Sequence, residues 1–434
     1  MAAGGLSSGR LARVREVLER QVESGFVPGA VAVLARRGEV RVVATGTLAF
    51  EGAGSGTPMA ADTICRLASM TKPLVAACAM TLVDDGTLRL DDPVDDLLPE
   101  LADMTVLADP AGPLDRTVPA ERPITLRDLL TYTFGTGVIP TGPGKIPIAD
   151  ALGALDYSSP DEWMRRLGAL PLAHQPGERW MYDTASNVTG VLIARATGMS
   201  FGEALRERIC DPLGMKDTAF SVAGGDSDRF ATAYRRDHAD TGEPVVEDGR
   251  DGRWSRPPPF ESGGGGLVST AQDFSAFASA LLAGGSHGGE RVLSGPSVAL
   301  MTGDRLTAAQ KAVSGFWPGF FNEMGWGFGV SVLTRPSRLG PSAGSYGWSG
   351  YYGTAWYNDP ARDLTALFFM QRGHAGDQRL PMWHDLWSGP GQEGGPGTPA
   401  PAAAAPAGGP GPAPHASGAA SVTASVAGVS PVAT

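Results

Sequence analysis

Cysteine is rare in this chain of 434 residues, and histidine is rare as well. The three cysteines, Cys65, Cys78 and Cys210, are too few and odd in number for a disulfide framework, and none has the Cys-x-x-Cys spacing of a zinc site. The six histidines show no paired spacing of the His-Glu-x-x-His kind. The sequence therefore predicts reduced thiols, a cytoplasmic location, and neither a metal nor a cofactor.

Long apolar runs and basic clusters are also missing. No stretch approaches the roughly 20 uninterrupted apolar residues of a membrane-spanning helix, and the N-terminus does not read as a signal peptide. Acidic residues outnumber basic ones by 46 to 35, which gives a net charge of −11, and the arginines are scattered. We therefore expect no membrane and no nucleic acid among the partners.

Glycine and proline are abundant, at 60 and 35 residues. They are densest in residues 389–434, where the sequence also lacks aromatic residues, lysine and arginine. Such a segment cannot bury enough apolar surface to offset its chain entropy. The sequence predicts a disordered tail over 389–434 and a folded catalytic domain over 1–388.

Hydrophobic patterns predict strands at both ends of the folded part and helices between them. Apolar residues at helical spacing over 11–22 predict an amphipathic helix, and two β-prone runs around Arg37-Gly38 predict a hairpin. The other expected elements are helices over 69–84, 125–130 and 187–196, a helix capped by Asp92, and strands over 30–35, 40–45, 327–333, 353–357 and 365–370. This order suggests one antiparallel sheet closed by both termini, from about 10–60 and 260–388, around a mainly helical insertion at about 61–259.

Ser69-Met70-Thr71-Lys72 is the first candidate for chemistry. Residues three apart lie on one face of a helix, so the Ser69 hydroxyl and the Lys72 amine can touch. A neutral amine there can take the hydroxyl proton and make the serine a nucleophile. Because Lys72 opens the most apolar helix expected, burial should depress its pKa enough for this role. The alternative is a helix-capping serine beside an unrelated lysine.

Two further segments are candidates for the same site. Tyr182 follows a Pro-Gly turn and precedes a helix, so its phenol can project into a cleft and relay protons beside a cationic lysine. The glycine-rich segment 347–353 can let a substrate approach backbone N–H donors. The alternatives are an interfacial tyrosine and a simple strand bend.

In this order, Ser69-x-x-Lys72, Tyr182 about 110 residues later and Trp348-Ser349-Gly350 resemble the serine β-lactamase and penicillin-binding protein superfamily. The chain is most similar to the class C-related family VIII carboxylesterases. The resemblance covers roughly residues 10–387 and implies a β-lactamase-like α+β (α/β) fold, with an antiparallel sheet flanked by helices. Supporting stretches are residues 90–93, 124–130, 211–215 and 263–273.

The resemblance implies a role for each matched residue. Ser69 would be the acyl-accepting nucleophile, Lys72 its base and Tyr182 the group that protonates the leaving group. Trp348-Ser349-Gly350 would stand where lactamases and peptidases carry Lys-Thr-Gly. The backbone N–H groups of Ser69 and Tyr351 would form the oxyanion hole.

Departures from the family pattern bear on the substrate. Trp348 replaces the cationic anchor for a substrate carboxylate, and Thr184 replaces the amide of Tyr-x-Asn. Tyr132 and Phe134 replace a common histidine and serine. The first two changes favour hydrolysis of small, largely neutral carboxylic esters, with acyl-chain length set by loops at 140–147 and 315–324. The alternatives are a β-lactamase or D-amino-acid peptidase, an acyltransferase of this fold, and a non-catalytic recognition protein.

Overall fold

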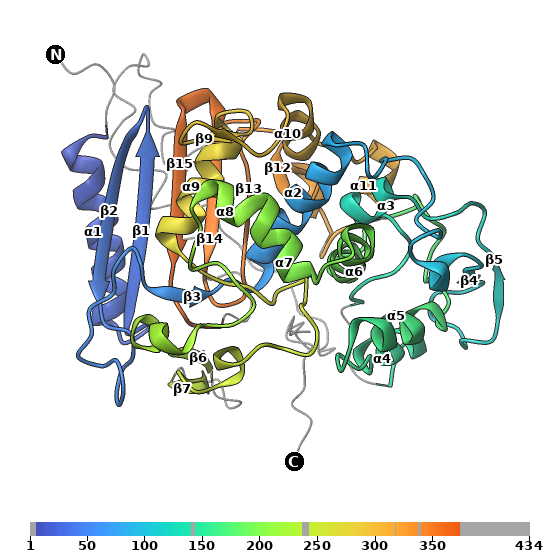
Figure 1. The fold of residues 1–434 in the computed structure, drawn as a ribbon, viewed down its shortest axis with the longest axis horizontal. Coiled ribbons are helices and arrows are strands. Elements are labelled where there is room, and N and C mark those ends of the chain that lie inside the picture. The colour runs from blue at the N-terminus through green and yellow to red at the C-terminus, as the bar shows by residue number, and fades with distance from the viewer. Residues whose placement is uncertain (1–5, 140–143, 237–242, 317, 337–339, 374–434) are drawn as a thin grey trace, which may run out of the picture.

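The computed structural model describes residues 6–139, 144–236, 243–316, 318–336 and 340–373. The expected tail over 389–434 lies outside these residues. An antiparallel sheet forms one side of the described molecule, and a mostly helical part packs beside it (Figure 1).

The sheet joins segments from the two ends of the chain. Its seven strands run in the order β11-β12-β13-β14-β15-β1-β2, and every neighbouring pair is antiparallel. The strands are β1 (Gly29–Arg36), β2 (Glu39–Gly46), β11 (Met324–Trp326), β12 (Ser331–Leu333), β13 (Tyr346–Ser349), β14 (Ala355–Asp359) and β15 (Leu364–Phe369). The predicted sheet built from both ends is confirmed, and the two ends of the chain meet where β1 pairs with β15.

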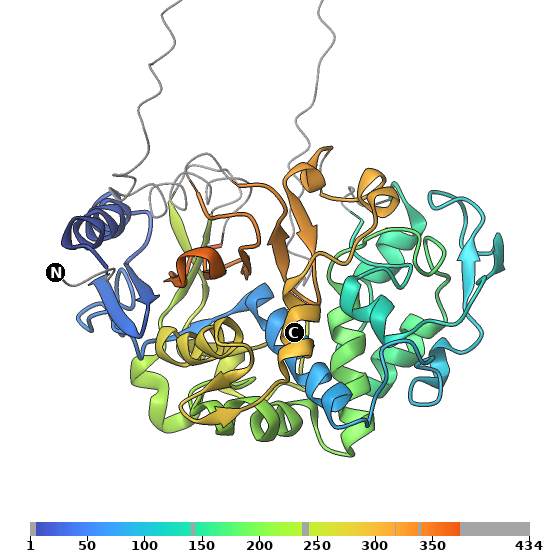
Figure 2. The same ribbon diagram turned by 90° about the horizontal axis from the view of Figure 1, so that it is seen from above.

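β1 is buried on both faces because a core packs against each side of it. Successive side chains of a strand point to opposite sides, so they enter the two cores in turn. Val31 and Val33 belong to the main core, whereas Ala32 and Leu34 pack in a second core under helix α1 (Ser8–Glu23). The α1 side chains in that core include Val14, Val17 and Leu18. Figure 2 shows α1 beside β1 and β2, at the end of the molecule away from the helical part.

Helix α2 (Thr71–Asp84) runs through the centre of the molecule (Figure 1). Its residues from Thr71 to Leu82 are all buried, as expected for a helix that is apolar all round. It packs against α6 (Thr184–Thr197), and α9 (Ala271–Leu282) covers the inner face of the sheet. Gly329 touches α2 so closely that a Cβ would lie 2.9 Å from the Lys72 carbonyl oxygen.

The remaining elements form the helical part and small two-stranded sheets. The helices are α3 (Leu126–Thr131), α4 (Pro147–Gly153), α5 (Pro160–Gly168), α7 (Phe201–Leu205), α8 (Asp211–Leu213), α10 (Gly295–Thr302) and α11 (Ala308–Ala312). The paired strands are β3 (Ile64–Arg66) with β8 (Val268–Thr270), β4 (Thr105–Leu107) with β5 (Thr117–Pro119), β6 (Ala233–Arg236) with β7 (Pro244–Asp248), and β9 (Ser286–His287) with β10 (Glu290–Arg291).

Two local predictions differ from the structure. Asp92 caps no helix, because Pro93 forms an isolated bridge with Thr125 and a turn at residues 95–97 follows in place of a helix. The strand expected from residue 327 begins only at Ser331, because Gly329 adopts a positive φ of 71° that interrupts an extended chain. Among the described residues, no helix is long and apolar enough to cross a membrane.

Candidate active site

Ser69 lies in a 3₁₀ turn, Ala68–Met70, that leads directly into α2. Ala68 has a φ of 46°, a left-handed conformation that is uncommon for a residue with a Cβ and costs energy. The turn is tied to the neighbouring chain by the Leu67 N–H, which donates to the Leu267 carbonyl at 2.9 Å. Ser69 is therefore held, partly exposed, at the N-terminal end of a buried helix.

Lys72 reaches Ser69 from one helical turn further along α2. Its Nζ donates a hydrogen bond to Ser69 Oγ at 3.0 Å and another to the Gly264 carbonyl, and it forms an ion pair with Asp183. The Lys72 side chain is fully buried. The spacing of three residues brings the two side chains together as the sequence predicts.

The charge on Lys72 differs from the expectation. Burial acts to lower the pKa of the amine, but the Asp183 carboxylate and the Tyr182 oxygen outweigh burial, so the pKa of Lys72 is raised above its ordinary value. The prediction that burial depresses this pKa is therefore wrong. The amine is charged in the resting site because a carboxylate lies against it.

Tyr182 immediately precedes Asp183 and the start of α6, and its ring faces Lys72. The distance from Lys72 Nζ to the centre of the ring is 4.6 Å, which is a cation–π contact. The Tyr182 hydroxyl accepts a hydrogen bond from Trp348 Nε1 at 2.8 Å. The structure therefore brings together Ser69, Lys72 and Tyr182, and adds Trp348 as a hydrogen-bond donor to the tyrosine.

The segment 348–351, at the end of β13, is fixed against the turn that carries Ser69. Gly350 approaches that turn so closely that a Cβ would lie 2.0 Å from the Leu67 carbonyl oxygen. The hydroxyl of Thr354 donates to the same oxygen at 2.9 Å. Only glycine fits this contact, and the following residue, Tyr351, is held next to the serine turn.

Asp183, Asn187 and Gly264 are site residues that the sequence analysis misses. Asn187 Oδ1 accepts hydrogen bonds from the Gly264 N–H and from Ser262 Oγ, both at 2.9 Å, and so fixes the loop whose carbonyl binds Lys72. Four consecutive glycines at 263–266 are a signal for close backbone approach. For Asp183 the only signal is its place beside Tyr182, and for Asn187 its place one helical turn later.

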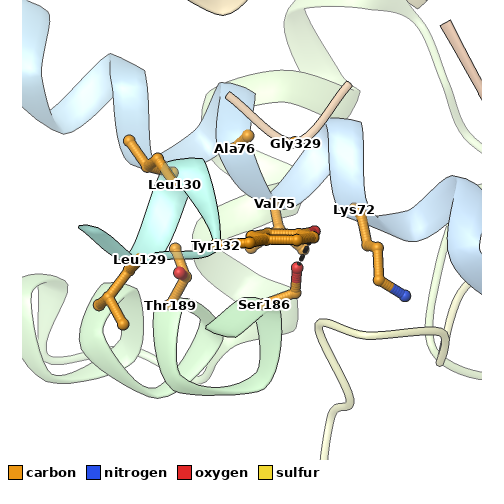
Figure 3. Close-up of a pocket in the computed structure, with 9 residues that line it drawn as sticks. All are labelled: Lys72, Val75, Ala76, Leu129, Leu130, Tyr132, Ser186, Thr189 and Gly329. Carbon is orange, nitrogen blue, oxygen red and sulfur yellow. Dashed lines mark hydrogen bonds between the residues drawn. The ribbon is translucent and has the colours of Figure 1, made fainter. Parts of the chain in front are cut away.

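Tyr132, one of the departures from the family pattern, packs beneath these residues. Its hydroxyl forms a hydrogen bond with Ser186 Oγ, and its ring meets the edge of Tyr182 at 5.9 Å between centres. Figure 3 shows Tyr132 and Ser186 beside Lys72, around a space too narrow to hold a water molecule. Burial raises the pKa of Tyr132 well above its ordinary value, so this phenol stays neutral.

A cavity of about 450 Å³ lies against Tyr182. Its wall is mainly apolar, and Ile146, Gly315 and Phe316 come from the two loops that the sequence analysis names. Asp109, His174 and Arg179 add polar groups, and burial together with Arg179 lowers the pKa of His174. A cavity of this size and lining suits a small, mainly apolar group.

The described residues contain no group of histidine, cysteine and acidic side chains arranged to hold a metal ion. All three cysteines are buried free thiols. The geometry is instead that of a serine, a buried lysine and a tyrosine at the N-terminal end of a central helix.

The match to known proteins extends over nearly all of the described chain. The family model described as Beta-lactamase matches residues 14–389. The chain belongs to the beta-lactamase family. Protein Rv1367c of Mycobacterium tuberculosis is 40% identical over 84% of this chain and 89% of its own length. Esterase EstB of Burkholderia gladioli is 33% identical over 84% of this chain and 91% of its own length.

A solved structure agrees with this family membership. It is that of EstCE1, a hydrolase with promiscuous acyltransferase activity, with a TM-score of 0.72 and 26% identity over 88% of this chain and 99% of its own. The predicted superfamily and the β-lactamase-like fold are confirmed. The esterase relatives of this beta-lactamase family member support the expected enzyme class, a serine hydrolase of carboxylic esters.

Proposed function

We propose that this enzyme hydrolyses small, largely neutral carboxylic esters through an acyl-enzyme formed on Ser69. The observation that carries the proposal is the hydrogen bond of 3.0 Å between Lys72 Nζ and Ser69 Oγ, with the Tyr182 ring over the same amine. A serine with a lysine as its proton acceptor needs no histidine. The ester-hydrolase relatives support the same reaction class.

The reaction would proceed in two halves. In its neutral form Lys72 takes the Ser69 proton while Ser69 Oγ bonds to the acyl carbon, and Tyr182 supplies a proton to the departing alcohol oxygen. The backbone N–H groups of Ser69 and Tyr351 would receive the negative charge on the carbonyl oxygen. The proton on Lys72 then passes to the Tyr182 oxygen, which restores both groups. Water attacks the acyl carbon and gives a proton to Lys72, and Ser69 Oγ leaves with that proton as the carboxylic acid is released.

Trp348 supports a neutral substrate. In this position the indole N–H is engaged with the Tyr182 hydroxyl, and its side chain carries no charge that could bind a substrate carboxylate. The mainly apolar cavity against Tyr182 offers room for the acyl or alcohol group. These features favour simple esters over penicillins and D-amino-acid peptides, whose recognition relies on a carboxylate.

Acyl transfer to an alcohol or amine is the second candidate. It differs from hydrolysis only in the nucleophile that attacks the acyl-enzyme, and the similarity to EstCE1, a hydrolase with promiscuous acyltransferase activity, favours it. If the enzyme can transfer the acyl group to an added alcohol, separating the products of a reaction that contains this alcohol would show a new ester.

The test is a paired assay of the wild-type enzyme and Ser69→Ala with p-nitrophenyl butyrate and nitrocefin. We expect ester cleavage by the wild type, little nitrocefin turnover, and a loss of at least about 1,000-fold in kcat/KM in the variant, because the nucleophile is gone. The circular dichroism spectrum of Ser69→Ala should match that of the wild type. Full ester cleavage by purified Ser69→Ala would contradict the proposal. Rapid nitrocefin hydrolysis by the wild-type enzyme would indicate that it is a β-lactamase instead.

A further inference from the structure

The Lys72 amine lies among three oxygen atoms. They belong to the Ser69 hydroxyl, the Gly264 carbonyl and the Asp183 carboxylate. A carbonyl and a carboxylate can only accept protons, whereas a hydroxyl can accept or donate. As an ammonium, Lys72 donates hydrogen bonds to the Ser69 hydroxyl and the Gly264 carbonyl, and its charge is in ion-pair contact with Asp183 Oδ1, which makes no hydrogen bond to the described residues. As a neutral amine, it can keep its two protons on the side of the two obligate acceptors, which leaves its lone pair for Ser69.

The fold holds Asp183 in place at a cost in backbone energy. Its φ of 86° and ψ of −59° are unusual for a residue with a side chain, and such strain persists only where the surroundings impose it. The Ser186 N–H donates to the Asp183 carbonyl at 3.0 Å. On the opposite side Gly264 leaves room for the carboxylate, because a Cβ there would lie 2.9 Å from Asp183 Oδ1.

Among the described residues, the other titratable groups that interact with this pair are phenols. Tyr182 precedes Asp183, Tyr132 comes from the end of α3, and Tyr157 comes from the segment between α4 and α5. Burial, with the Asp183 charge added to it, raises the pKa of Tyr157 to about 12, and burial raises the pKa of Tyr132 further. These two phenols therefore stay neutral at the pH values at which an esterase is assayed, and Asp183 supplies the negative charge beside Lys72.

We propose that Asp183 is a positioning residue of this site: its charge holds Lys72 as an ammonium in the resting enzyme, and its oxygen and the Gly264 carbonyl aim the lone pair of the neutral amine at Ser69. The inference rests on the function proposed above. Acylation begins when the ammonium releases a proton to solvent. The Ser69 proton then moves to the Lys72 nitrogen as Ser69 Oγ bonds to the acyl carbon. Because the carboxylate opposes the first proton release, it shifts acylation toward alkaline pH.

Asparagine and glycine at position 183 separate the charge from the acceptor oxygen. Asp183→Asn keeps the shape and one acceptor oxygen, and asparagine tolerates a positive φ. Asp183→Gly suits the same backbone but removes the oxygen as well. Asp91→Asn is the matched control, because it neutralises an exposed carboxylate that pairs with Arg127.

The first measurement is kcat/KM for p-nitrophenyl butyrate as a function of pH. In Asp183→Asn the rising limb should move to lower pH by at least about one unit, with the rate above the limb retained, because only the charge is lost. In Asp183→Gly the limb should move in the same direction, and the rate above it should fall. Asp91→Asn should leave the midpoint of the limb in place. A purely structural role would lower the rate at every pH without moving the limb, and this result would overturn the inference.

The second measurement observes Lys72 directly. The chain has only four lysines, Lys72, Lys145, Lys216 and Lys311, so the ¹³Cε resonances of labelled lysine can be resolved and Lys72 assigned with Lys72→Arg. Lys72 should titrate at least about one pH unit lower in Asp183→Asn than in the wild type. Equal titration in the two proteins, or a higher value in the variant, would overturn the inference. Failure of the proposed function would show differently, as wild-type enzyme that cleaves no ester while Lys72 still responds to the substitution.

Discussion

At the scale of single residues, the site combines groups that the sequence motif contains with groups that the fold supplies. Ser69 and Lys72 are held together by helical spacing, and their hydrogen bond follows from the sequence alone. The charge on Lys72 does not, because it depends on Asp183, which is remote in sequence. The local motif therefore defines which groups meet, and the tertiary neighbours define their protonation.

Trp348 offers a test at the residue scale. Trp348→Phe keeps an aromatic ring but removes the N–H that donates to the Tyr182 hydroxyl at 2.8 Å. One hydrogen bond is worth about 0.5–1.5 kcal/mol, so we expect kcat/KM for p-nitrophenyl butyrate to fall by about two- to tenfold. An unchanged kcat/KM in Trp348→Phe would show that the indole N–H does not act in the reaction.

Tyr182→Phe should lower kcat/KM by about 100-fold or more, because it removes the proton donor itself.

At the scale of elements, the site depends on the contact between α6 and the glycine run 263–266. Asn187 on α6 is buried and accepts two hydrogen bonds from this run and the residue before it. Through the Gly264 carbonyl, the contact continues to Lys72 on α2. Asn187 thus joins α6 to this loop, and Lys72 joins the loop to α2.

Asn187→Ala tests this connection. The substitution leaves the buried Gly264 N–H without its acceptor, so the free energy of unfolding should fall by about 1–3 kcal/mol. Urea unfolding followed by tryptophan fluorescence measures the change. Ser262→Ala is the control, because it removes one donor to Asn187 and leaves the Gly264 contact in place. Equal stabilities of Asn187→Ala and Ser262→Ala would show that the Gly264 contact contributes little.

At the scale of the whole molecule, both ends of the described chain belong to one sheet that has a core on each face. β1 lies between β2 and β15, with a core on each face. The contacts continue past β15, since the Arg372 N–H donates to the Tyr352 carbonyl at 3.0 Å and Gly373 to that of Tyr234 at 2.7 Å. The folded part of the described chain therefore extends to Gly373, well beyond the site residues in sequence.

The division at residue 388 is a prediction that truncation can check. A chain that ends at residue 388 should keep the wild-type midpoint of thermal unfolding and the wild-type kcat/KM, because the last strand among the described residues ends at Phe369 and the segment beyond 388 has a composition that cannot form a core. Differential scanning calorimetry and the ester assay measure both quantities. A fall of several degrees in the midpoint would mean that residues 389–434 contribute to the folded domain.

The sequence by itself determined the features that are local or repeated. Helical spacing placed Lys72 beside Ser69, the alternating and apolar runs predicted the central strands and α2, and the succession of motifs indicated the family. Each of these depends on residues a few positions apart, or on patterns that a single element carries.

Only the tertiary structure decided the electrostatics of the site. Asp183, Gly264 and Trp348 reach Lys72 and Tyr182 through the packing of separate elements, and no spacing in the sequence encodes those distances. Burial of Lys72 could be read from its apolar helix, but the direction of its pKa could not. A buried amine loses its proton when it is alone and keeps it when a carboxylate lies against it, and the fold alone determines which of the two applies.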